Sequence, residues 1–128
     1  MAQVLGVGGI FFKSKDPKAL MDWYQRALGV PGEHGYAVLR PEQIPPGGAT
    51  VFSPFKQDSD KFAPGRDFMF NLMVDDLDGA LRQVQEAGGQ LVGEREDYGD
   101  FGLFGWFMDP DGNKVELWQP KAKGAEKD

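Results

Sequence analysis

Apolar residues recur at helical spacing in two stretches of the chain. In each stretch they fall three or four residues apart, which places them on one face of an α-helix. Asp16-Pro17 and Asp75-Asp76 precede the two stretches as typical helix starts, and Gly29 and Gly88-Gly89 follow them as typical helix ends. The two stripes are Leu20, Trp23, Tyr24, Ala27 and Leu28, and then Leu77, Ala80, Leu81 and Val84. The pattern predicts two amphipathic helices that each cover a sheet.

Short apolar runs bounded by Gly, Pro and Asp surround these helices and predict β-strands. The segments expected as strands are 4–13, 36–40, 49–53, 68–74, 90–96, 101–108 and 114–118. The turn sequence Asp109-Pro110-Asp111-Gly112-Asn113 joins the last two. Helices and strands together predict an α+β fold.

The second half of the chain repeats the order of elements of the first. At an offset of 60, Asp16 corresponds to Asp76 and Gly29 to Gly89; at an offset of 66, residues 51–54 correspond to residues 117–120. We therefore predict one domain over residues 1–120, built from two βαβββ modules at about 4–55 and 66–120. Residues 121–128 are expected to form a charged, disordered tail.

Composition excludes several classes of function. Among 128 residues the net charge is -6 and basic residues form no cluster, which argues against binding to nucleic acid. Neither a membrane-length apolar stretch nor a secretory signal is found, so we expect a soluble, cytoplasmic protein without membrane partners. The chain has no Cys and one His, His34, so one chain cannot supply thiolate ligands or a pair of imidazoles.

Aromatic residues make up 12% of the chain and crowd into residues 52–70 and 98–118. This crowding indicates either the walls of a ligand cavity or the interior of a β-rich core, and composition leaves both open.

The closing motif Asp109-Pro110-Asp111-Gly112-Asn113-Lys114-Val115-Glu116-Leu117-Trp118 resembles the vicinal oxygen chelate superfamily. The helix opening Lys15-Asp16-Pro17, with Trp23-Tyr24 and Leu28-Gly29, carries the same resemblance. That superfamily includes glyoxalase I, extradiol dioxygenases and the bleomycin and fosfomycin resistance proteins. The resemblance implies two modules that form a curved mixed sheet, with helices on the convex side and a ligand cavity on the concave side.

Strand alternation then sorts the side chains between the two faces. Val115 and Leu117 are expected to face the helices, and reading the register through the five-residue turn places Trp106 opposite Glu116. The candidate ligand-binding residues are those expected on the concave face: Phe11, Lys13, Thr50, Phe52, Met69, Asn71, Met73, Phe104, Trp106, Glu116 and Trp118.

The resemblance also implies four metal-ligand positions, which hold His or Glu in the superfamily's enzymes. In this chain they are Gly9, Thr50, Met69 and Glu116, so only Glu116 retains a ligand. Glycine offers no side-chain ligand and a thioether suits soft metals. We therefore expect no tightly held metal and no cofactor, while weak binding of a divalent metal stays open.

Glu116 is the most informative single residue, and two interpretations of it compete. It is either a general base or counter-charge in an apolar cavity, or a structural carboxylate that pairs with Lys13 or Lys114 or is solvated. Asp109, Asp111 and Asn113 are interpreted as turn formers, since a short turn lacks the spacing of a calcium loop.

Three functions follow from these residues. The first is a metal-free protein of the bleomycin resistance type, which binds a small aromatic or cationic molecule between Phe52, Trp106 and Trp118. The alternative is a divalent-metal-dependent lyase or isomerase similar to lactoylglutathione lyase, with Glu116 as metal ligand or catalytic general base. A regulatory or structural module is the third. The resemblance further implies a homodimer.

Overall fold

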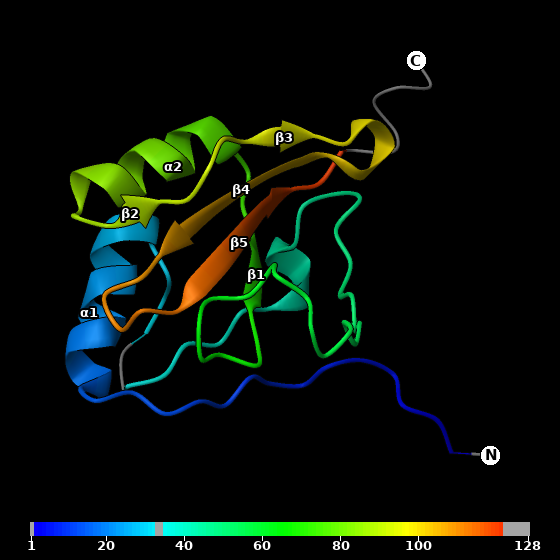
Figure 1. The fold of residues 1–128 in the computed structure, drawn as a ribbon. Helices are drawn as coiled ribbons and strands as arrows, with labels where there is room; N and C mark the ends of the chain where they lie inside the picture. The colour runs from blue at the N-terminus through cyan, green and yellow to red at the C-terminus, as the bar shows by residue number, and fades with distance from the viewer. Residues whose placement is uncertain (1, 33–34, 122–128) are drawn as a thin grey trace.

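The computed structural model describes residues 2–32 and 35–121 (Figure 1). His34 and residues 122–128 of the expected tail lie outside the described residues. The elements, in chain order, are α1 (Pro17–Leu28), the 3-10 turn η1 (Pro41–Gln43), β1 (Phe70–Met73), α2 (Leu77–Glu86), β2 (Gln90–Leu91), β3 (Glu96–Asp97), the 3-10 turn η2 (Gly99–Phe101), β4 (Leu103–Met108) and β5 (Lys114–Gln119). The predicted α+β class is confirmed.

The strands form one mixed sheet in the order β1-β5-β4-β2, with β3 also pairing with β4. β1 runs parallel to β5, and α2 lies in the chain segment between them. The other pairs are antiparallel, and the β4–β5 hairpin forms the middle of the sheet. β1 is therefore an edge strand.

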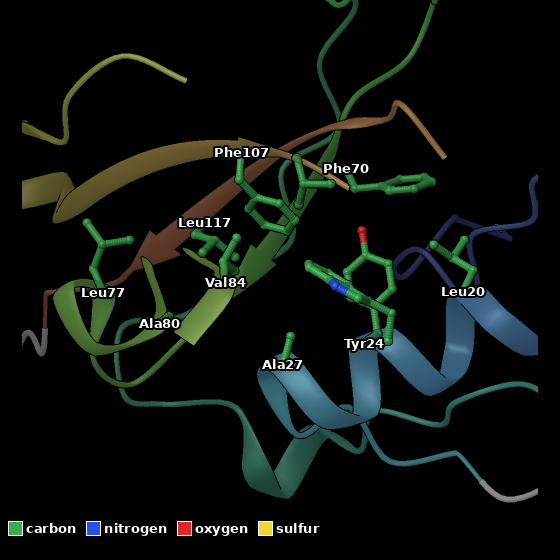
Figure 2. Packing of buried hydrophobic residues seen from close by; sticks show 11 residues of the cluster. Leu20, Tyr24, Ala27, Phe70, Leu77, Ala80, Val84, Phe107 and Leu117 are labelled. Atoms are coloured by element: carbon green, nitrogen blue, oxygen red, sulfur yellow. The ribbon is translucent and has the colours of Figure 1, made fainter. Parts of the chain in front are cut away.

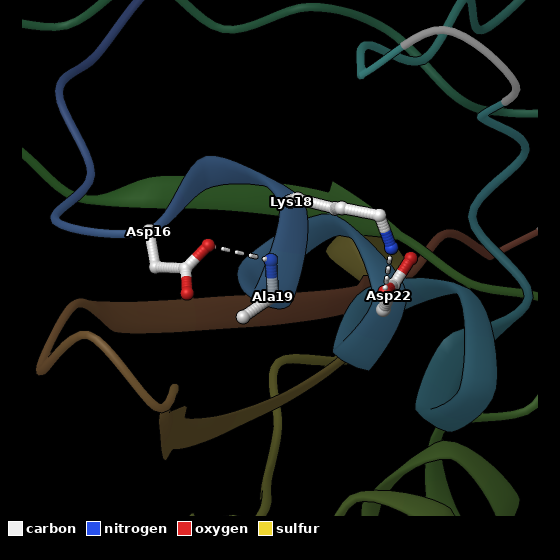
Figure 3. A network of polar contacts seen from close by, with 4 residues as sticks. All are labelled: Asp16, Lys18, Ala19 and Asp22. Carbon is white, nitrogen blue, oxygen red and sulfur yellow. Dashed lines mark hydrogen bonds and ion pairs between the residues drawn. The ribbon is translucent and has the colours of Figure 1, made fainter.

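Both helices start on an aspartate that caps the first turn. Asp16 Oδ1 accepts a hydrogen bond from the Ala19 amide at 3.1 Å, as Figure 3 shows, and Asp76 Oδ1 accepts one from Gly79 at 3.1 Å. Such a cap is worth about 1 kcal/mol, because it satisfies an amide that the helix leaves unpaired. The 60-residue offset is thus confirmed at the helix starts.

The core lies between the two helical stripes and the inner face of β4 and β5 (Figure 2). Phe107, Val115 and Leu117 are fully buried there. The helices are also tied to each other, since Trp23 Nε1 donates to the Ala87 carbonyl and Gln83 Nε2 to the Ala27 carbonyl, each at 2.9 Å. Each fully buried large side chain contributes about 1.5–3 kcal/mol.

The predicted strands 68–74 and 114–118 correspond to β1 and β5 to within two residues at each end, whereas the other two of the second module differ more, and glycines explain both. The segment 90–96 splits into β2 and β3 around Gly93, whose φ is 66°. The segment 101–108 becomes a strand only at Leu103, because η2 and Gly102, with φ 108°, occupy its start. Positive φ interrupts a ladder and favours glycine.

The first module contributes its helix but not its strands. No β-strand forms within 4–13, 36–40 or 49–53, so these three strand predictions are wrong for this structure. The segments form no ladder, and their apolar side chains are exposed: Phe11 by 96% and Phe52 by 89%. A strand needs a neighbour for its backbone groups and a surface for its apolar face. None of these segments pairs with a strand, and although the ring of Phe12 packs on Phe70 at 4.6 Å, most of their apolar side chains find no such surface.

Candidate functional site

The sheet face opposite the helices carries two rows of side chains that run across the strands. The first row is Asn71, Glu116 and Trp106, and the second is Met73, Trp118, Phe104 and Glu96. Directly paired residues project from the same face of a sheet. The expected register, with Trp106 opposite Glu116 and Phe104 opposite Trp118, is confirmed.

Two N–H donors hold the carboxylate of Glu116. Asn71 Nδ2 donates to Oε1 at 2.6 Å and Trp106 Nε1 donates to Oε2 at 2.9 Å. Neither Lys13 nor Lys114 forms an ion pair with it within the described ranges, and Lys114 Nζ instead donates to the Lys61 carbonyl at 2.8 Å. The carboxylate is oriented by neutral groups, so it presents a charge without a cationic side chain beside it.

An aromatic row lies next to Glu116. The rings of Phe104 and Trp118 are stacked with centroids 6.0 Å apart and planes at 10°, and Tyr98 lies 5.1 Å from Phe104 on the other side. Trp118 Nε1 donates to the Phe101 carbonyl at 2.6 Å, and Trp118 is only 9% exposed. Trp118 is therefore almost fully buried, whereas Phe104 and Trp106 are half-buried and remain accessible to solvent.

Tyr98 and Glu96 extend this row on β3 and the residue that follows it. The Tyr98 hydroxyl donates to Glu96 Oε1. This hydrogen bond, more than the nearby negative charges of Glu96 and Glu116, raises the pKa of Tyr98 above its ordinary value. The Tyr98 hydroxyl thus joins the Glu96 carboxylate to a ring that contacts Phe104.

The first-half candidates do not join this face. Phe11, Lys13, Thr50 and Phe52 are exposed and belong to no strand. The structure therefore presents an open, one-sided aromatic face and not a cavity walled by both modules.

Met73 lies in β1, and both Met73 and Met69 are half-buried. Met69 immediately precedes the strand. Met73 ends its row under the loop around Gly48, where an added Cβ would lie 2.8 Å from Met73 Sδ. The loop thus covers one end of the second row.

The residues present do not fit the metal that the superfamily's enzymes use. Gly9 has no side chain, Met69 brings no hard ligand, and Thr50 is exposed and lies in no strand, so Glu116 has no partner ligand from the other three positions. Across residues 2–32 and 35–121, no three Asp, Glu, His or Cys side chains lie close enough to hold a metal ion. No chemical step through a metal follows from this arrangement.

The hairpin turn after β4 forms hydrogen bonds with residues that are distant in the sequence. Buried Asp109 accepts from the Tyr24 hydroxyl at 2.8 Å and from Asn113 Nδ2 at 2.9 Å, besides two backbone amides of the turn. Arg66 Nη1 donates to Asn113 Oδ1 at 3.0 Å. Burial, and then the charge of Asp109, raise the pKa of Tyr24. The interpretation of this sequence as a turn is confirmed.

A separate cleft of about 490 Å³ lies where α1 ends and α2 begins. It does not include Glu116. Its lining is Leu28, Gln43, Pro45, Met73, Val74, Asp75, Asp76, Ala80 and Gln83.

Comparison with known families agrees with this architecture. The model of a family described as a glyoxalase-like domain matches residues 9–118. The chain belongs to this family. The glyoxalase-like chain is thereby a member of the vicinal oxygen chelate superfamily, as its closing motif indicated. No curated protein matches it. None of its described helices is long and apolar enough to span a membrane.

Several solved structures are similar to this chain, and TnmS3 shares its fold. TnmS3, an antibiotic-binding protein from Streptomyces sp. CB03234, is 22% identical with a TM-score of 0.58, over 94% of this chain and all of that one. A glyoxalase/bleomycin resistance protein/dioxygenase superfamily member from Sphaerobacter thermophilus is 27% identical with a TM-score of 0.48, over 93% and 98% of the two chains. TioX from Micromonospora sp. ML1 is 18% identical with a TM-score of 0.48, over 94% and 97%.

Sequence reasoning missed Glu96 and Tyr98. It treated residues 90–96 as one strand, so no register linked Glu96 to Phe104. The signal that was available is Gly93, because a glycine inside a strand pattern often marks a break in the ladder.

Proposed function

We propose that this glyoxalase-like protein binds a small, planar, aromatic cation on the face that carries Glu116, without a tightly held metal. The observation that carries the proposal is the oriented carboxylate: Asn71 and Trp106 hold Glu116 beside aromatic rings, and no described cationic side chain neutralises it. A carboxylate in this setting attracts a cation, and half-buried rings add stacking and cation–π contacts.

The remaining features of the chain support this class of ligand. A net charge of -6 favours the approach of cations to the protein. TnmS3, which has the same fold, is an antibiotic-binding protein. The alternative of a metal-dependent lyase or isomerase is supported less, because the donor set around Glu116 does not suit a divalent metal.

We further propose that the functional form is a homodimer. Most of the large apolar side chains exposed in the described residues precede β1, with Phe11 and Phe52 among them. Within the described part of the chain no strand pairs with the outer edge of β1, to which an extended segment of a second copy could add. The expected cytoplasmic location stays a prediction.

Metal analysis combined with tryptophan fluorescence tests the proposed function. We expect purified protein to hold less than stoichiometric Ni, Zn, Mn or Fe, and cationic aromatics to change its tryptophan emission in the presence of EDTA. The variant Glu116→Gln keeps the volume of the side chain and removes its charge, so it should weaken that response. A stoichiometric metal that disappears in Glu116→Gln would overturn the metal-free proposal.

A further inference from the structure

Glu96 provides a second carboxylate at the far side of the same aromatic face. It pairs with Phe104 across β3 and β4, while Glu116 pairs with Trp106 across β4 and β5. Glu96 therefore lies two strands away from Glu116 in the sheet and is displaced from it by two residues along the strand direction. With strands about 4.8 Å apart and a rise of about 3.4 Å per residue, their backbone positions are roughly 12 Å apart.

Aromatic side chains lie on the strands between the two carboxylates. Phe104 lies against Trp118 on one side and against Tyr98 on the other. Trp118 Nε1 donates to the carbonyl of Phe101, which ends the short turn that follows Tyr98. The rings of Trp118, Phe104 and Tyr98 therefore form a row that begins beside Glu116 on β5 and ends at the partner of Glu96.

Each carboxylate is oriented by a neutral donor and not by a cation. Glu116 accepts from Asn71 and Trp106, and Glu96 accepts from the Tyr98 hydroxyl. In residues 2–32 and 35–121 neither of the two forms an ion pair. Two oriented negative charges at the ends of an aromatic strip are complementary to a ligand with the opposite pattern.

We propose that the ligand class is an elongated planar aromatic molecule with two cationic groups, one bound at Glu116 and the other at Glu96 with Tyr98. This inference rests on the proposed function and adds a second charge site to it. Tyr98 acts there as a positioning residue, because its hydroxyl holds Glu96 next to the ring of Phe104.

The test uses stilbamidine, a rigid planar molecule with an amidinium at each end, and stilbene that carries a single amidinium. Isothermal titration calorimetry in EDTA gives both dissociation constants. We expect Glu96→Gln to weaken stilbamidine binding about fivefold and to leave the mono-amidine within about twofold, since an exposed charge-assisted contact is lost only with the longer ligand. Glu116→Gln should weaken both ligands.

Glu94→Gln is the matched control, because it removes the same charge from an exposed residue that lies outside β3. It should change neither dissociation constant by more than about twofold. Tyr98→Phe should weaken the binding of stilbamidine and not that of the mono-amidine, as Glu96→Gln does. Added metal should restore the affinity of neither variant.

The outcomes separate this inference from the proposed function. If Glu116→Gln weakens both ligands while Glu96→Gln affects neither, or both equally, the second charge site is wrong and the first stands. If the mono-amidine binds without any dependence on Glu116, the proposed function itself is overturned. If Glu94→Gln acts as strongly as Glu96→Gln, general charge and not a built site explains the effect.

Discussion

The indole N–H of Trp106 donates a hydrogen bond to Glu116 across the β4–β5 ladder, at 2.9 Å between Nε1 and Oε2. This bond links the aromatic surface to the negative charge of Glu116, because Trp106 supplies both an aromatic ring and the N–H donor that orients the carboxylate. Asn71 on the edge strand supplies the other donor.

Replacing Trp106 by Phe removes the donor and keeps an aromatic ring. We expect the affinity for the mono-amidine to fall about threefold, because Glu116 loses one of its two orienting bonds, each worth roughly 1 kcal/mol. Calorimetric titration measures the change, and urea unfolding checks that stability stays within about 1 kcal/mol of the wild type. An unchanged affinity would mean that the bond does not matter for binding.

Tyr24 predicts how stability depends on alkaline pH. Its phenol has a raised pKa, so the native state holds this proton more tightly than the unfolded chain, where the pKa is near 10. Stability should therefore be independent of this group below about pH 10 and should fall above it, by at most about 1.4 kcal/mol per pH unit.

Urea unfolding of wild type and Tyr24→Phe between about pH 8 and pH 11.5 checks this prediction. The variant should be about 1–3 kcal/mol less stable at neutral pH, because Asp109 loses a donor while buried. It should also show a smaller alkaline slope. Equal slopes in the two proteins would contradict the assignment.

The Asp109 turn should depend on hydrogen bonds and not on calcium. Asp109→Ala leaves the Tyr24 hydroxyl and the Asn113 amide without their acceptor, and we expect a loss of about 3 kcal/mol. Asp60→Ala, on an exposed residue, is the control and should change stability by less than about 0.5 kcal/mol. Calcium should not raise Tm in thermal unfolding; a clear rise in wild type that Asp109→Ala abolishes would favour a cation site.

Gly102 should tolerate no side chain. Its φ of 108° and ψ of -159° lie where only glycine is relaxed, and an added Cβ would collide with the Gln119 carbonyl of the neighbouring strand. We expect Gly102→Ala to cost about 3 kcal/mol in urea unfolding. Gly99→Ala, where φ is 62° but no atom lies within 4 Å, should cost about 1 kcal/mol. A cost at Gly102 no larger than the cost at Gly99 would contradict the predicted collision.

The proposed homodimer is tested by size-exclusion chromatography with light scattering. We expect twice the chain mass, and Phe11→Glu with Phe52→Glu should shift the protein towards the monomer, because both side chains are exposed in the single chain. Lys15→Glu, on an exposed residue outside the apolar segments, is the control. A wild-type monomer at high concentration would contradict the proposal.

Patterns that depend on local chemistry were predictable from the sequence. Asp16 and Asp76 cap their helices, and strand alternation places Glu116 and Trp106 together because the five-residue turn fixes the register. The features that could not be predicted depend on whether a segment finds a neighbouring strand for its backbone hydrogen bonds. Residues 4–13 have the composition of a strand but find no neighbouring strand. Gly93 separates β2 from β3, so the pairing of Glu96 with Phe104 could not be predicted from one continuous strand.

The dissociation constant of mono-amidine stilbene in EDTA, measured by calorimetry for wild type and Glu116→Gln, tests the central claim most directly. The account predicts saturable binding to metal-free wild type, weakened by about tenfold or more when the charge is removed, with Glu94→Gln unchanged. Binding that appears only after a divalent metal is added, or that is equal in wild type and Glu116→Gln, would contradict it.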